Sequence, residues 1–149
     1  MERLYLLRHA KSSWDQAQLA DFDRPLNQRG YNDAQAMADY IDQQGYQPEV
    51  ILCSSAMRTR ETLSPILKLM KNQPEVIFLD SIYEAEWTAL RDAVEERTED
   101  SIMLIGHCPG IELYLSRILG QIKEMKTCHL AVIDWPDKKL VDFIRPKEF

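Results

Sequence analysis

Residues 4–9 read Leu4-Tyr5-Leu6-Leu7-Arg8-His9, a short apolar run that ends in a guanidinium and an imidazole group. The run shows no alternation of apolar and polar residues, which predicts a strand that is covered on both faces. Four more runs of this kind follow at 50–52, 76–79, 102–105 and 130–133, and residues 141–144 favour a last strand. The sequence therefore predicts a sheet of short, buried strands.

The stretches between these runs have the spacing of amphipathic helices. Apolar residues recur every three or four positions at 34–41, 59–70, 87–94 and 111–119, and Gly45 ends the first stretch. Because strands and helices alternate, we expect an α/β fold: a single-domain, three-layer α/β/α sandwich with a mostly parallel central sheet. A chain of 149 residues fits one domain, spanning 1–149.

Composition and charge exclude several classes of partner. The formal net charge of -6 opposes binding to nucleic acid, so any anion site must be a local cationic pocket. The first apolar run is too short for a signal-peptide core or a membrane span, and we expect no membrane partner. Cys53, Cys108 and Cys128 form no C-x-x-C pair, which is typical of a reducing compartment. The sequence predicts a cytoplasmic protein.

Polar side chains follow three of the predicted strands. Arg8-His9 closes the first strand, Arg58 comes shortly after the second, and His107 follows the fourth. Carboxyl ends of parallel strands share one edge of a sheet, so two guanidinium and two imidazole groups are expected near a common ligand. The paired N–H donors of a guanidinium group match the oxygens of a phosphoryl group. A neutral imidazole can attack phosphorus, while a second imidazole binds the phosphoryl oxygens. This chemistry predicts a phosphate site and leaves open which histidine attacks.

Other mechanisms fit the sequence less well. Cysteine phosphatases need a C-x5-R pattern, but only four residues separate Cys53 from Arg58. The pair Asp21 and Asp23 resembles an aspartate nucleophile with its partner, yet no strand-like run precedes it. The sequence has no H-x-x-x-H motif or Cys/His cluster, so we expect neither a metal nor another cofactor.

Four segments together resemble the histidine phosphatase superfamily, which has the phosphoglycerate mutase-like fold. They cover nearly the whole chain, and the resemblance is strongest to the small SixA-type phosphohistidine phosphatase branch. The segments are Leu6-Leu7-Arg8-His9-Ala10-Lys11, Asp23-Arg24-Pro25-Leu26 with Gly30, Ser54-Ser55-Ala56-Met57-Arg58-Thr59-Arg60-Glu61-Thr62, and Gly106-His107-Cys108-Pro109-Gly110.

The resemblance implies a role for each of the four strand-end residues. His9 is implied as the phosphate acceptor, Arg8 and Arg58 as phosphate ligands, and His107 as the second catalytic histidine. The sequence departs from the family pattern at Ala10, where glycine is usual, and at Cys108, where asparagine is usual. We expect the added methyl group of Ala10 to be tolerated, while Cys108 lacks an amide that could orient its neighbours.

The remaining site candidates come from loops. The segment 11–25 shows neither helical nor strand period, which predicts a functional loop, and its Lys11 and Ser12 are candidates for contact with phosphate or substrate. Glu84, after the third strand, is the best candidate for the acid that protonates the leaving group. The carboxylates ranked behind it are Asp21, Asp23 and Glu86.

These features predict a metal-independent phosphatase that works through a covalent phosphohistidine intermediate. A nitrogen leaving group needs less help from an acid than an ester oxygen does, and the short connections leave no room for a lid. Both points favour phosphohistidine on a protein, such as a phosphotransfer domain, as the substrate. The alternatives are a phosphomonoesterase acting on a small phosphorylated metabolite and a phosphate-recognition module without catalysis.

Overall fold

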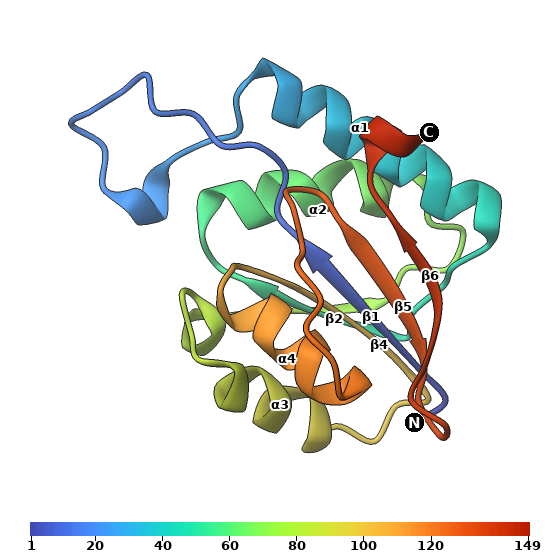
Figure 1. Cartoon of the computed structure of the whole chain (residues 1–149). Coiled ribbons are helices and arrows are strands. Elements are labelled where there is room, and N and C mark those ends of the chain that lie inside the picture. The colour runs from blue at the N-terminus through green and yellow to red at the C-terminus, as the bar shows by residue number, and fades with distance from the viewer.

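The computed structural model describes all residues, 1–149, and contains one six-stranded sheet (Figure 1). The strand order is β3-β2-β4-β1-β5-β6. Only β5 runs against its two neighbours, so the sheet is mostly parallel as predicted. The strands are β1 (Arg3–Arg8), β2 (Val50–Ser54), β3 (Glu75–Leu79), β4 (Ser101–Gly106), β5 (Leu130–Asp134) and β6 (Lys139–Ile144).

Helices cover both faces of the sheet, which confirms the predicted three-layer α/β/α sandwich (Figure 1). One core layer packs α1 and α2 against the side of β1 that carries Tyr5 and Leu7. The other packs α3 and α4 against the side that carries Leu4 and Leu6. The helices are α1 (Gln28–Gln44), α2 (Met57–Leu69), α3 (Trp87–Glu95) and α4 (Gly110–Leu119). No helix combines the length and the apolar character that crossing a membrane requires.

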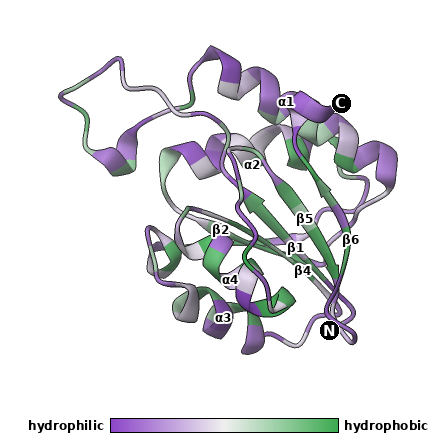
Figure 2. Cartoon of the chain, viewed as in Figure 1, coloured by the Kyte–Doolittle hydropathy of each residue, from purple (hydrophilic) through white to green (hydrophobic).

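The apolar runs are hydrophobic without alternation because both faces of the central strands are buried. All five residues of β2 are buried, and Figure 2 shows the strands as the most hydrophobic part of the chain. The expectation of two covered faces is wrong for β3, whose residues are half-buried or exposed. As an edge strand, β3 has a neighbour on one side only, and its Phe78 remains 41% exposed.

Helix α1 is joined closely to the loop that follows β1. The side chain of Asn27 caps the helix by accepting the Gly30 N–H at 2.8 Å, and Gly45 ends it in the left-handed conformation with φ 70°. A Cβ atom on Gly30 would lie 2.0 Å from the carbonyl oxygen of Lys11. Only glycine therefore lets α1 pack against the loop that begins at Lys11.

Gly30→Ala is expected to lower the free energy of unfolding by about 2 kcal/mol, because the clash outweighs the better helix propensity of alanine. Urea unfolding measures the change. The control is Gln35→Ala, a substitution on the exposed face of the same helix that is expected to have little effect. Equal stability of Gly30→Ala and the wild type would contradict the close packing of α1 on Lys11.

Candidate active site

The four predicted side chains meet in one cavity of about 310 Å³ at the carboxyl edge of the parallel strands. Arg8 is the last residue of β1 and pairs in register with Gly106, the last residue of β4. His9 and His107 are the next residues along each strand, and their ring centroids lie 5.2 Å apart. Arg58 enters from the first turn of α2, directly after β2. Neighbouring parallel strands thus bring together residues that are distant in sequence.

His9 has its ring orientation and its tautomer fixed by the backbone. Its Nδ1 lies 2.7 Å from the carbonyl oxygen of Ala10, and because a carbonyl only accepts, Nδ1 must carry the proton. The lone pair is then on Nε2. The pKa of His9 is lowered to about 3, mainly by burial, and the neighbouring His107, Arg58 and Arg8 act in the same direction. His9 is therefore a neutral imidazole at neutral pH, the form that can act as a nucleophile.

We expect the His9 ring to stay neutral, in its Nδ1–H tautomer, between about pH 8 and about pH 5. An ordinary histidine gains its second ring proton within this range. The sign follows from the lowered pKa, since His9 gains a proton only as the pH falls toward about 3. Nitrogen NMR of the histidine rings measures both properties. Gln35→His, on the exposed face of α1, supplies the reference histidine, and an equal midpoint for the two rings would contradict the burial of His9.

His107 has one ring nitrogen bound and the other unused. Its Nε2 lies 2.8 Å from Oγ of Ser54, while Nδ1 is buried without a hydrogen-bond partner. The edge of the ring packs against Tyr83, with centroids 5.4 Å apart. The pKa of His107 is lowered to about 4, mainly by burial; Arg58 and Arg8 act in the same direction, and Asp21 opposes them. His107 is therefore neutral at neutral pH.

The two arginines are held by different parts of the chain. Arg8 donates from Nη1 to the carbonyl oxygen of Met125 at 2.8 Å, and its Nε is buried without a partner. Arg58, only 3% exposed, donates to the carbonyl oxygen of Asp21 at 2.8 Å and to its Oδ2 at 3.0 Å. Both guanidinium groups are fixed before any ligand enters, which suits them to bind an oxyanion.

The loop 11–25, which projects from the body of the molecule in Figure 1, contributes a third arginine that the sequence analysis missed. Arg24 is 8% exposed and lines the cavity. It donates to Asp21 Oδ1 at 2.6 Å, to the Ser12 hydroxyl and to the Ser13 carbonyl at 3.0 Å, and the Trp14 ring covers it at 3.3 Å. Arg24 lies within the quoted family segment Asp23-Arg24-Pro25-Leu26, which is the signal that could have identified it.

The surroundings of each carboxylate candidate decide whether it can serve as the proton donor. Burial acts to raise the pKa of Asp21, but hydrogen bonds from Tyr83, Arg24 and Arg58 outweigh it and hold that pKa well below its usual range. Asp21 therefore stays ionised and does not suit the role of proton donor. Asp23 and Glu86 do not line the cavity.

Glu84 does line the cavity, as do the other loop candidates Lys11 and Ser12. Its Oε1 lies 3.5 Å from Nη2 of Arg58, and its side chain is 58% exposed. The backbone of Glu84 has φ 48°, in the left-handed region that residues other than glycine rarely adopt. Such strained positions concentrate at functional sites, so the backbone supports Glu84 as the candidate acid.

The two departures from the family pattern have local explanations. The methyl group of Ala10 is fully buried in the core beside Leu26, and its N–H donates to the Thr62 hydroxyl at 3.0 Å. It therefore does not narrow the cavity. The Cys108 thiol donates to the Met125 carbonyl at 3.3 Å, the oxygen that Arg8 also contacts, and burial raises its pKa to about 11. Cys108 remains a neutral thiol at this site.

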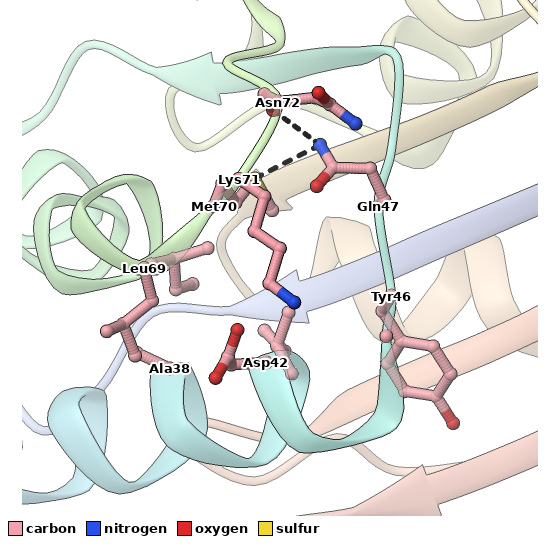
Figure 3. Close-up of a pocket in the computed structure, with 11 residues that line it drawn as sticks. Ala38, Asp42, Tyr46, Gln47, Leu69, Met70, Lys71 and Asn72 are labelled. Carbon is pink, nitrogen blue, oxygen red and sulfur yellow. Dashed lines mark hydrogen bonds between the residues drawn. The ribbon is translucent and has the colours of Figure 1, made fainter.

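A second cavity, of about 230 Å³, lies at the opposite edge of the sheet between the carboxyl ends of α1 and α2 (Figure 3). Its only charged lining residues are Asp42 and Lys71, and it contains none of the predicted site residues. The chain contains no group of three His, Cys, Asp or Glu side chains arranged to hold a metal ion. Arg8, His9, Arg58 and His107 therefore belong to the cavity at the carboxyl edge and not to this one.

The sandwich, its strand order and the cavity at the carboxyl edge define a phosphoglycerate mutase-like α/β protein. The sequence model of the histidine phosphatase superfamily (branch 1) matches residues 4–101. The chain belongs to this superfamily, as the four sequence segments predict.

Solved structures extend the similarity over the whole chain. The proposed phosphohistidine phosphatase SixA from Agrobacterium tumefaciens is 32% identical, with a TM-score of 0.90 over 97% of this chain and 98% of that one. A protein histidine phosphatase SixA solved with tungstate shares the fold, with a TM-score of 0.82 at 19% identity over 98% of both chains. The resemblance to the SixA-type branch is thereby confirmed.

Two protein relatives carry no assigned function. An uncharacterised chloroplast protein of Arabidopsis thaliana is 35% identical over 144 residues, which are 88% of this chain. The match covers 65% of the length of that relative. An uncharacterised protein of Mycobacterium leprae is 41% identical over 119 residues, 76% of this chain and 71% of the relative.

Proposed function

We propose that the protein is a metal-independent phosphatase in which His9 takes up the phosphoryl group. The observation that carries the proposal is the tautomer of His9, because the Ala10 carbonyl holds Nδ1–H and leaves the Nε2 lone pair free. In the first step Nε2 forms a bond to phosphorus, the bond from phosphorus to the leaving group breaks, and the leaving group takes a proton. In the second step water bonds to phosphorus, the bond to Nε2 breaks and orthophosphate leaves.

The other residues of the cavity have complementary roles in this proposal. Arg8 and Arg58 bind the phosphoryl oxygens, and His107, which lines the same cavity, binds an oxygen on which charge accumulates. A dianion in the cavity raises the proton affinity of His107 and favours its charged form. Glu84, at the exposed rim, gives the proton to the leaving group and receives the proton of the attacking water.

We propose phosphohistidine on a protein, such as a phosphotransfer domain, as the substrate. The wall of the cavity at Glu84 is open, so a phosphorylated side chain can enter while its protein remains outside. A neutral imidazole is a good leaving group, which suits a site whose acid candidate is exposed to water. The similarity to a proposed phosphohistidine phosphatase supports this choice.

The three unpaired thiols support a cytoplasmic location.

A substrate panel tests the proposal. Turnover of a phosphohistidine protein is expected to exceed that of small phosphomonoesters, and it is expected to remain unchanged in excess chelator because no step uses a metal. Faster turnover of a phosphomonoester would contradict the protein substrate and support a small-molecule phosphomonoesterase. Binding of phosphoproteins without turnover of any substrate would support a phosphate-recognition module instead.

A further inference from the structure

A groove of about 430 Å³ adjoins the cavity on the side of Glu84. One wall is the turn that leads into α3, and the other is the first turn of α4. The lining residues are Glu84, Ala85, Glu86, Trp87, Pro109, Gly110 and Leu113. The groove has the size of a ligand site, and both of its charged residues are acidic.

The groove and the cavity are neighbours and share one lining residue. Glu84 lines both, and Cys108 of the cavity is followed directly by Pro109 of the groove. Leu113 lies three residues beyond Gly110, about 4.5 Å along the helix axis. A protein that places a phosphorylated side chain in the cavity therefore brings its neighbouring surface over this groove.

The walls of the groove combine apolar and acidic residues and are firmly placed. A Cβ on Gly110 would lie 2.2 Å from the carbonyl oxygen of Ala85, so the two walls are in direct contact at this glycine. The Trp87 ring has the guanidinium groups of Arg91 and Arg117 at 5.1 Å and 4.9 Å from its centroid. Leu113 remains 47% exposed although it belongs to an otherwise well-packed helix. Leu113 and the partly buried Trp87 thus give the groove an accessible apolar surface next to the cavity.

We propose that this groove binds an apolar side chain that the phosphorylated protein carries next to its phosphohistidine. The inference rests on the proposed function and adds to it a way to distinguish phosphorylated proteins from free phosphohistidine. Glu84 is paired with Arg58, and Arg91 and Arg117 lie against Trp87. The apolar surface of Leu113 and Trp87, and not net charge, is therefore expected to select this side chain. Free phosphohistidine has the same reactive bond but no such neighbour, so the groove selects protein substrates.

The test compares two substrates with the same leaving group. One is a histidine phosphotransfer domain that has been phosphorylated chemically with phosphoramidate, and the other is free phosphohistidine. Leu113→Ala is expected to lower kcat/KM for the protein about tenfold, mainly through KM, with no change for the free amino acid. Leu113→Glu is expected to have a larger effect of the same kind, because it places a charge on the apolar surface of the groove. Val141→Ala, which alters a 41% exposed residue on edge strand β6, is the matched control.

The outcomes separate the groove from the catalytic proposal. If the wild type hydrolyses the protein faster than free phosphohistidine and both Leu113 variants keep that ratio, the groove inference is wrong and the phosphatase proposal stands. If the wild type hydrolyses neither substrate, the catalytic proposal fails and the groove inference fails with it. Leu113 is exposed, and thermal unfolding of each variant verifies that the substitution leaves the fold intact.

Discussion

Replacing His9 with alanine is expected to lower kcat by at least about 10⁴-fold, the scale of loss when a covalent nucleophile is removed. His9→Ala leaves the guanidinium groups in place, so phosphate binding is expected to persist while the covalent step is lost. Rapid quenching after exposure to a labelled phosphodonor detects the intermediate. The wild type is expected to give an acid-labile, base-stable label, and the variant none.

His129→Ala provides the matched control for this result. His129 is also a buried histidine, but it lies at the start of β5, accepts the Lys126 N–H at 2.9 Å through Nδ1 and stacks on Phe143 with centroids 4.0 Å apart. It does not line the cavity, so its replacement is expected to leave the label intact. If His9→Ala retained both the label and turnover, another residue would be the nucleophile.

Arg58→Ala is expected to lower kcat/KM by about 10³-fold, because arginines that contact a phosphoryl group in transfer have effects of this size. The loss has two origins. Two or more donors to the phosphoryl oxygens disappear, and the ionised Asp21 loses the cation that neutralises it. Steady-state kinetics measure the loss, and guanidinium ion added to the solution is expected to restore part of the activity.

Arg60→Ala is the matched control, two residues away on the same helix. Arg60 donates to the Ser55 carbonyl at 2.8 Å and lies over the Phe78 ring at 4.0 Å, outside the cavity. Its removal is expected to leave kcat/KM unchanged. An Arg58→Ala variant with normal kinetics would show that binding of the phosphoryl group does not need Arg58.

The fold was predictable because burial on both faces removes the apolar and polar alternation from the central strands. Leu4 and Leu6 pack into one layer and Tyr5 and Leu7 into the other, which is why this run is apolar throughout. The direction of β5 was not predictable, since its residues resemble those of the parallel strands. Its reversal has a consequence for the site, because it places the segment before Leu130 at the carboxyl edge of β1.

The site residues that stand at strand ends could be predicted from the sequence. Those whose position depends on long-range contacts of a loop could not. Arg8, His9 and His107 follow strands, so the topology alone brings them together. Arg24 lies on a loop without periodicity, and its hydrogen bonds to Asp21 and Ser12 depend on how that loop folds back. The carbonyl of Met125 comes from the segment before the reversed strand, and local sequence gives no signal for a backbone acceptor.

The pairing of Arg58 with Asp21 has a consequence for the end of the catalytic cycle. A guanidinium has five N–H groups, and Asp21 already accepts from two nitrogens of Arg58, so a fixed anion shares that cation with whatever enters the cavity. Free orthophosphate carries no protein body to add contacts outside the cavity, so its binding depends on the donors of Arg58 that Asp21 does not occupy. We therefore expect orthophosphate to be a weak product inhibitor.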